Sequence, residues 1–305
     1  LAGVLDAQAR ETPGGDPETS AVTGRIAPDT QLVTLARVLE RLSHRITDQH
    51  HRLTALVEEL REALVTKTRL AMLEQELEIA KDLQYSLLPH PLEADPSFDL
   101  DGIMHTAKEV GGDFYDFFRF DETRLAVVVG DVSGKGVPAA LFMAITRTQL
   151  RSAALDTASP AAVLARTNTV LATDNEQMMF VTLFYGVLDL ATGVLTYANA
   201  GHNPPYLQRA DGAVEQLPGL GDPAAAVLED IPYGEESVRL HPGDALFLYT
   251  DGVTEAFDVE GAAFREERLV EVLRAEGPSA SAKAIDEAVL AAVKRFERGA
   301  DQADD

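Results

Sequence analysis

Large apolar residues recur at alternating steps of three and four near the start of the chain, and this spacing constrains the fold more than any other feature. The series comprises Leu32, Leu35, Leu39, Leu42, Ile46, Leu53, Leu56 and Leu60, with Gln49 at one further position of the same series. Such heptad spacing places these side chains on one stripe of a helix. The sequence therefore predicts a helix over residues 30–90. It either packs on its own domain or, as we favour, forms a parallel homodimeric coiled coil through residues 32–88.

The heptad register changes phase where Val65, Thr66 and Thr68 lower the helix propensity. A discontinuity of this kind changes the supercoil locally. Pro89 and Pro91 are expected to end the helix, because proline lacks the backbone N–H and restricts the residue before it. The prediction is a helix that changes its packing partway along and stops just before residue 90.

The segments on either side of this helix differ in composition. Residues 1–29 are rich in proline, glycine and small polar residues, which predicts a flexible linker or the remnant of an upstream domain. Residues 93–305 have the pattern of a globular domain, with strands expected at 125–129, 180–190, 194–199 and 245–249. Helices are expected at 138–154, 160–174 (with Ser159 as N-cap), 265–275 and 279–297. Hairpins followed by pairs of helices predict an α+β fold with antiparallel sheets covered by helices.

Charge and composition exclude several classes of function. The formal net charge is −24, which should repel nucleic-acid backbones and favour divalent cations as ligands. There is no cysteine, so disulfides, zinc–thiolate sites and iron–sulfur clusters are excluded. No apolar run is long enough to cross a membrane. We expect a cytoplasmic protein. Since the chain begins at Leu1, we also expect a fragment, which can belong to a membrane-bound sensor with an upstream sensor domain.

Four aspartates stand in similar local settings: Asp113, Asp131, Asp251 and Asp304. Three of them adjoin glycine, and two are expected where a buried strand meets a tight turn. Any single Asp–Gly pair fits an ordinary turn. Several carboxylates brought together would repel one another unless a cation neutralised them. Mg²⁺ and Mn²⁺ prefer oxygen ligands, so the set favours a site for such ions, which can activate water and hold a phosphoryl group.

The stretch "GDVSGKG" (130–136) has the glycines and the lysine of a nucleotide-binding loop, but not their spacing. A P-loop requires serine or threonine after the lysine, whereas Gly136 follows Lys135. Lys135 is either a contact for substrate phosphate or a solvated loop residue. In "AGHNP" (200–204), His202 and Asn203 are either turn residues, the reading we favour for His202, or substrate contacts.

The motifs together resemble a known family. "LQYSLLP" (83–89), "GGDFYD" (111–116), "GDVSGKG", "AGHNP", "YTDGVTEA" (249–256) and "DD" (304–305) occur in the order found in bacterial metal-dependent serine/threonine phosphatases of the stage II sporulation protein E type. These are relatives of the type 2C phosphatases and include regulators of sigma factors in stress responses. The resemblance covers residues 76–305. It implies an αββα sandwich of two antiparallel sheets flanked by helices, here preceded by the N-terminal coiled-coil helix.

The resemblance also assigns roles to residues. It implies two Mn²⁺ or Mg²⁺ ions held by Asp113, Asp131 as the bridging ligand, the Val132 carbonyl, Asp251 and Asp304, with Asp305 as an outer or alternative ligand. A metal-bound water would then attack phosphorus directly, without a phosphoenzyme. Two departures matter. Ser133 stands near the position of a histidine proposed as general acid in type 2C relatives, and the family continues beyond "DD" into a further strand.

By the same resemblance, the substrate is a phosphorylated anti-sigma-factor antagonist, whose dephosphorylation takes part in signal transduction. Dimerisation through the coiled coil would control the metal site, because the helix expected near Val137 directly follows Asp131. Residues 20–60 also resemble the last part of a HAMP linker, a signal-transducing segment. The alternative is a catalytically inactive regulatory or scaffold module that binds a phosphoprotein through the same face.

Overall fold

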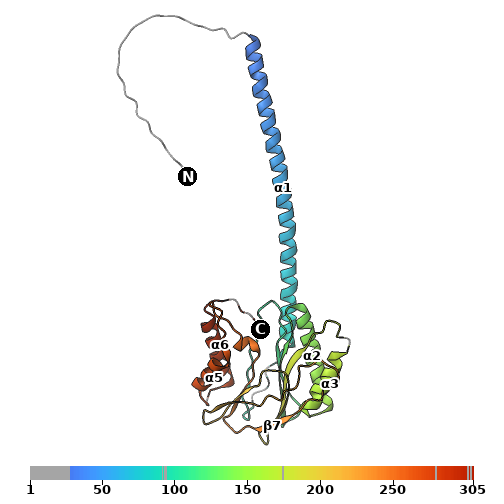
Figure 1. The fold of residues 1–305 in the computed structure, drawn as a ribbon, viewed down its shortest axis with the longest axis vertical. Coiled ribbons are helices and arrows are strands. Elements are labelled where there is room, and N and C mark those ends of the chain that lie inside the picture. The colour runs from blue at the N-terminus through green and yellow to red at the C-terminus, as the bar shows by residue number, and fades with distance from the viewer. Residues whose placement is uncertain are drawn as a thin grey trace, which may run out of the picture. The chain divides into compact units, whose positions relative to one another are not determined.

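A computed structural model describes residues 28–90, 92, 95–173, 175–278, 280–300, 302 and 304–305. Nearly all of the linker predicted at 1–29 therefore lies outside the described residues. The chain divides into two compact units, one up to Leu70 and one from Ala71 onward. Figure 1 shows the elements in chain order, with the long N-terminal helix in blue.

Helix α1 (Pro28–Leu87) confirms the predicted helix and runs without interruption through the change of register. There, the Thr66 and Thr68 hydroxyl groups donate hydrogen bonds to backbone carbonyls four residues earlier. The helix ends two residues before Pro89, as expected. The eight apolar residues of the heptad stripe are each at least 48 % exposed in the single chain. In the described part of the chain, no helix has the length and apolar character needed to cross a membrane.

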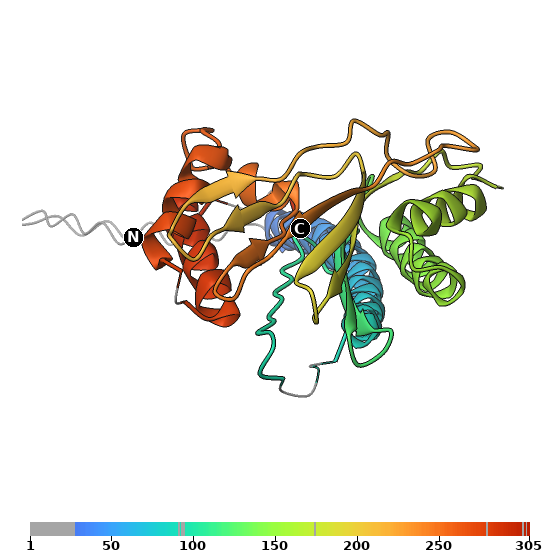
Figure 2. The ribbon, with the colours of Figure 1, turned by 90° about the horizontal axis from the view of Figure 1, so that it is seen from below.

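The second unit is an αββα sandwich, which confirms the predicted fold class. One antiparallel sheet has the order β1-β2-β3-β4-β7 and the other the order β6-β5-β8. Its strands are β1 (Phe114–Arg119), β2 (Arg124–Val132), β3 (Val181–Asp189), β4 (Val194–Ala200), β5 (Tyr206–Gln208), β6 (Val214–Gln216), β7 (Glu236–Arg239) and β8 (Ala245–Phe247). Its other helices are α2 (Val137–Asp156), α3 (Pro160–Ala172), α4 (Asp251–Thr254), α5 (Arg265–Glu276) and α6 (Ala282–Glu297). In Figure 2 the sheets stand between the pair α2–α3 and the pair α5–α6.

Three apolar layers hold this sandwich together. The five-stranded sheet packs on α2 and α3 through residues that include Val128, Met143 and Leu164. The three-stranded sheet packs on α5 and α6, and a third cluster with Phe184 and Leu207 lies between the sheets. The burial of apolar surface in these layers is the main source of stability.

The β2 strand is longer than predicted, and this changes the position of Asp131. Gly130 pairs with both Phe114 and Leu183, so the strand continues through it to Val132 instead of turning. A Cβ at Gly130 would lie 2.6 Å from a ring atom of Phe114, so this glycine serves close packing. Asp131 therefore lies within a strand, not in the turn that follows it.

The turn begins only after Val132. There, Gly134 and Gly136 have φ of 88° and 80°, a left-handed conformation that favours glycine. Helix α2 then starts at Val137. Helix α3 starts after Ser159, whose side chain accepts a hydrogen bond from the Ala162 amide, which confirms the predicted N-cap.

A buried ion cluster ties α2 to β1. The buried Asp116 carboxylate accepts from the Arg151 guanidinium at 2.6 and 2.7 Å, and the Arg147 Nε lies 3.1 Å from it. The Arg151 guanidinium also lies over the Phe118 ring, 4.7 Å from its centre. Removing one partner from such a cluster leaves a buried charge without compensation. The cluster therefore fixes α2 against the strand that starts immediately after Asp113.

A buried histidine links the two sides of the sandwich near its acidic edge. The His202 Nδ1 lies 2.8 Å from the Thr182 hydroxyl oxygen, and its Nε2 lies 3.1 Å from the Tyr249 carbonyl oxygen. Because a carbonyl can only accept, Nε2 carries the hydrogen and Nδ1 accepts from Thr182. Burial lowers the pKa of His202 to about 4, although the bond to Tyr249 opposes this shift. The neutral ring thus connects β3 to the segment just before Asp251.

Acid should destabilise the fold through His202. Between its ordinary pKa of 6.5 and its folded pKa of about 4, the unfolded chain binds a proton that the folded chain does not. The stabilisation by the neutral ring is complete above pH 6.5 and is lost as the pH falls towards 4. At about 1.4 kcal/mol per pKa unit, the loss is roughly 3 kcal/mol.

The measurement is urea unfolding over this pH range for the wild type and His202→Gln. The variant should be less stable at neutral pH, and the difference should shrink by roughly 3 kcal/mol on acidification. A difference that stays constant over the range would contradict this assignment.

Candidate metal-binding active site

Four aspartates from separate segments come together at one edge of the sandwich. Asp113 directly precedes β1, Asp131 lies in β2, Asp251 is the first residue of α4 and Asp304 lies near the C-terminus. Asp131 and Asp304 each raise the pKa of Asp251, and Asp131 raises that of Asp113. The structure therefore gathers the four carboxylates that the sequence singled out.

Asp113 and Asp251 are held out of solvent beside other negative charges. Asp113 is only 6 % exposed, and burial raises its pKa well above the ordinary value, with the neighbouring Asp131 adding to the effect and the Thr250 hydroxyl opposing it. Burial, followed by the charges of Asp131 and Asp304, raises the pKa of Asp251 to about 6. Each negative charge makes ionisation of the neighbouring carboxyl groups less favourable, so a cluster of this kind is stabilised by an added cation.

Strand pairing and one close approach position the central pair. Asp131 lies opposite Thr182 in the ladder between β2 and β3. Next to Asp113, the backbone of Gly112 comes so near the Val132 carbonyl that a Cβ would lie 2.8 Å from that oxygen. Asp113, Asp131 and the Val132 carbonyl therefore occupy one small region, as their proposed roles require.

The C-terminal aspartates are held by different partners. Asp304 Oδ1 lies 2.9 Å from the Lys135 Nζ. Asp305 accepts hydrogen bonds from the Ala107 amide at 2.8 Å and the Gly112 amide at 2.7 Å. Asp305 thus supports the segment before Asp113, whereas Asp304 joins the loop after Asp131. A side chain at Gly111 would clash with the Asp305 carboxylate, so this glycine gives the C-terminal residue its room.

One residue at the site had no role assigned from the sequence. Gln84, near the end of α1, is buried; its Nε2 donates to the Gly111 carbonyl at 2.7 Å and its Oε1 accepts from the Gly111 amide at 3.1 Å. Gln84 therefore fixes both the amide and the carbonyl group of Gly111, two residues before Asp113. A signal for it existed in the sequence. After the change of phase, the stripe continues through Leu70, Leu73, Leu77, Ala80 and Leu87, and this spacing puts Gln84 on the same stripe.

The donor set fits a hard divalent cation. Carboxylate and carbonyl oxygens are the ligands that Mg²⁺ and Mn²⁺ prefer. Lys135 already places one positive charge beside Asp304. Within the described residues, no three carboxylate or imidazole groups form a preformed ligand cluster. The assignment of ligands to Asp113, Asp131, Val132, Asp251, Asp304 and Asp305 stays a prediction.

The three residues predicted as substrate contacts lie in different environments. Lys135 is exposed on the loop beside the carboxylates, where it faces Asp304. His202 is buried, with both ring nitrogens in hydrogen bonds within the protein, and Asn203 beside it is half-buried. Of the three, only the Lys135 side chain combines exposure with a contact to the acidic edge.

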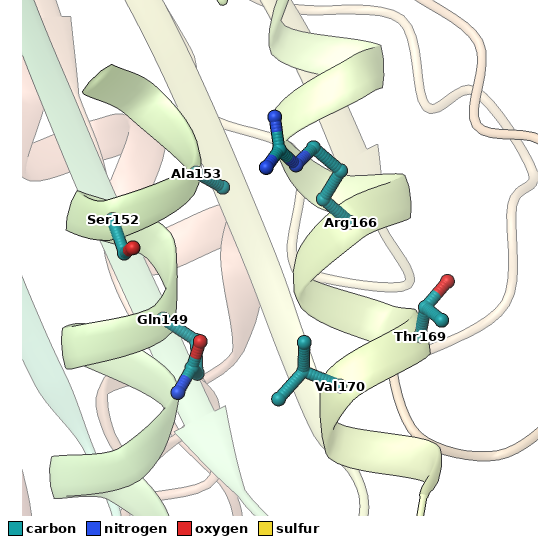
Figure 3. Close-up of a pocket in the computed structure, with 6 residues that line it drawn as sticks. All are labelled: Gln149, Ser152, Ala153, Arg166, Thr169 and Val170. Atoms are coloured by element: carbon teal, nitrogen blue, oxygen red, sulfur yellow. The ribbon is translucent and has the colours of Figure 1, made fainter. Parts of the chain in front are cut away.

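Two cavities help to locate the chemistry. A cavity of about 1130 Å³ extends between the sheets and α6 and reaches Asp113 and Asp305. A smaller one, of about 270 Å³, lies between α2 and α3 and is shown in Figure 3. It is lined by Gln149, Ser152, Ala153, Arg166, Thr169 and Val170. Because this lining contains no carboxylate or imidazole, the acidic edge is the better candidate for the active site.

The chain is similar to several characterised proteins. It is 34 % identical over 227 residues to protein IcfG of Synechocystis sp. (66 % of this chain, 36 % of IcfG). It is 32 % identical over 184 residues to phosphoserine phosphatase RsbU of Bacillus subtilis (60 % of this chain, 54 % of RsbU). It thus spans about a third to a half of these relatives' lengths.

The solved SiaA-PP2C domain of Pseudomonas aeruginosa shares the fold. It matches with a TM-score of 0.65 at 24 % identity, over 77 % of this chain and 94 % of that domain. The family model described as stage II sporulation protein E (SpoIIE) matches residues 121–305, which is more than half of the chain. The chain therefore belongs to the stage II sporulation protein E family.

Proposed function

We propose that this chain is a Mn²⁺- or Mg²⁺-dependent protein phosphatase that hydrolyses phosphoserine or phosphothreonine. The observation that carries the proposal is the gathering of Asp113, Asp131, Asp251 and Asp304 at one edge of the sandwich. The similarity to RsbU and RsbP, both named phosphoserine phosphatases, supports it. The metal ions, when bound, would activate water and offset the charge of the phosphoryl group.

The residues of the chain have separate tasks in this proposal. The four aspartates and the Val132 carbonyl would hold the ions, with Asp131 as the central ligand. Asp305 and Gln84 keep the backbone around Gly112 in place. Lys135 is positioned to bind a phosphate oxygen of the substrate, since its Nζ lies 2.9 Å from Asp304 at this edge.

Ser133 has a positioning task. Its hydroxyl oxygen accepts a hydrogen bond from the Phe180 amide at 2.9 Å, which holds the loop after Asp131. Because serine does not act as an acid near neutral pH, water protonates the leaving oxygen. The proposed substrate is the phosphorylated anti-sigma-factor antagonist expected from the resemblance, and the cytoplasm is its proposed location.

Asp131→Asn should abolish most of the metal-dependent hydrolysis. The amide cannot bridge two cations as a carboxylate does. We therefore expect a loss of at least about 100-fold, the upper end of what losing an outer-shell partner of a metal ligand costs. The measurement is hydrolysis of para-nitrophenyl phosphate with Mn²⁺ and with EDTA. Asp121→Asn is the matched control. Asp121 forms an exposed ion pair with Arg124 at the hairpin that joins β1 to β2, the end of this strand pair farther from Asp131.

Equal activity in Asp131→Asn and the wild type would eliminate the metal assignment. A wild type without any Mn²⁺-dependent hydrolysis would favour the inactive phosphoprotein-binding module instead.

We further propose that two copies pair through α1 and that pairing controls the site. The apolar stripe from Leu32 to Leu60 is uncovered in one chain, and a second copy would bury it in a coiled coil. Gln84 on the same helix holds Gly111, two residues from Asp113. A change in the helix can thereby shift the population of chains whose carboxylates are placed for metal binding.

Leu56→Pro should therefore lower both dimerisation and phosphatase activity, because proline breaks the helix within the seam. Leu56→Lys should do the same while keeping the helix, by placing like charges across the seam. Glu62→Lys lies on the outer face of the helix, away from the seam and from the positions that flank it, and should change neither. Light scattering measures the oligomeric state. An activity loss of about tenfold would mean that the free energy of the metal-competent state rises by about 1.4 kcal/mol relative to the incompetent state.

Gln84→Ala separates the two steps, since it should leave the dimer intact and lower activity. If oligomeric state and activity are unchanged in both Leu56 variants, the coupling proposal is wrong.

A further inference from the structure

Four large apolar side chains are exposed on two adjacent loops of the second unit. Met178, Phe180, Val227 and Leu228, which we call the Phe180 patch, are between 42 % and 84 % exposed. The loops lie side by side: Val181 and Ala225 exchange two backbone hydrogen bonds of 3.0 and 2.8 Å just beyond the patch. Exposed apolar residues gathered in this way mark interaction sites more often than single ones do.

The patch is held in a fixed conformation by two asparagines. Asn168, which is fully buried, donates to the Leu228 carbonyl at 2.9 Å and accepts from the Ala226 amide at 2.8 Å. Asn175 donates to the Met179 carbonyl and accepts from its amide, at 2.7 and 3.0 Å.

The backbone between these anchors is strained. Met178 and Ala226 have φ of 51° and 69°, a left-handed conformation that non-glycine residues rarely adopt. The surrounding bonds thus hold the Met178 and Leu228 side chains outward at an energetic cost, which indicates a site organised before binding.

The patch directly adjoins the proposed active site. The Ser133 amide donates to the Phe180 carbonyl at 2.8 Å, and the Phe180 amide donates to the Ser133 hydroxyl oxygen at 2.9 Å. Ser133 follows Asp131 by two residues. An extended peptide advances about 3.3 Å per residue. A substrate with its phosphoserine at the carboxylates would therefore place residues a few positions away over the patch.

The border of the patch is acidic. Glu176, Glu229 and Asp230 are exposed on the same two loops, and the chain as a whole carries a net charge of −24. Negative potential attracts lysine and arginine and repels anionic lipid surfaces. Charge complementarity therefore favours a protein partner with basic residues beside an apolar side chain.

We propose that the Phe180 patch binds the protein substrate, receiving an apolar side chain near the phosphorylated residue while lysine or arginine beside it faces the acidic border. This inference rests on the proposed phosphatase function and extends it to the choice of substrate. Contacts of this kind discriminate between substrates without taking part in the chemistry.

Two synthetic phosphoserine peptides test the proposal, one with leucine and lysine around the phosphoserine and one with serine and glutamate. The wild type should show about tenfold higher kcat/KM for the leucine–lysine peptide, the discrimination that one apolar contact supplies. The double variant Met178→Ser/Leu228→Ser should lose this preference, mainly through KM. Its hydrolysis of para-nitrophenyl phosphate should be unchanged.

Leu155→Ser is the matched control. Leu155 is 86 % exposed and lies at the opposite end of α2 from the site, so the preference should persist in this variant. Fluorescence anisotropy of the two labelled peptides should show the same preference in binding. This readout tests the patch independently of catalysis. If the wild type is inactive but still binds the leucine–lysine peptide more tightly, the proposed phosphatase function is wrong and the proposal for the patch stands.

Equal affinity and equal kcat/KM for the two peptides would overturn the proposal, and so would a preference that survives in the double variant. A parallel loss of para-nitrophenyl phosphate hydrolysis would show that the patch supports the site instead of the substrate. Two further outcomes would also overturn the proposal. If the wild type but not the double variant sediments with phosphatidylcholine vesicles, the patch binds a membrane. If the double variant loses its dimers, the patch binds a second copy of the chain.

Discussion

Mutual repulsion between carboxylates at one edge of the sandwich is the constraint on which the rest of the site depends. Asp113 and Asp251 are held where burial and neighbouring charges raise their pKa values. Such groups would move apart if the fold did not hold them, and when they are held together they bind protons, or an added cation, more readily. The ladder between β2 and β3 fixes Asp131, and the His202 ring connects that ladder to the segment before Asp251. The fold thus holds repelling carboxylates together at the edge where we propose that cations bind.

The supports of this edge reach into two helices. Gln84 connects the end of α1 to Gly111, and the Asp116 cluster connects α2 to the strand after Asp113. In the proposed regulation, a displacement of α1 would act through Gln84 on the backbone just before Asp113. The Phe180 patch is bonded to Ser133, two residues after Asp131. Under both proposals, control and substrate choice would therefore act on neighbouring parts of the same site.

The sequence predicted the long helix, the fold class and the four aspartates because each has a strong local pattern. It missed β1, β5, β6 and β7. Strands β5, β6 and β7 are only three or four residues long, too short for a clear alternating pattern, and β5 and β7 also pair with the distant strands β8 and β4. It placed Asp131 in a turn because glycine usually marks one, whereas Gly130 is a strand residue that makes room for Phe114. The contacts of Gln84 and His202 depend on tertiary structure, so spacing could indicate their positions but not their partners.

The stability of the metal-free protein tests the central claim most directly. Asp113→Asn removes one buried negative charge while keeping the shape of the side chain. If repulsion at the acidic edge destabilises the fold, this variant should melt several degrees above the wild type without metal, at about 2–4 °C per kcal/mol. Mn²⁺ at about 100 times its Kd should stabilise the wild type by about 2.7 kcal/mol and the variant much less. A metal-free variant that melts below the wild type, or an equal response of both to Mn²⁺, would contradict the claim.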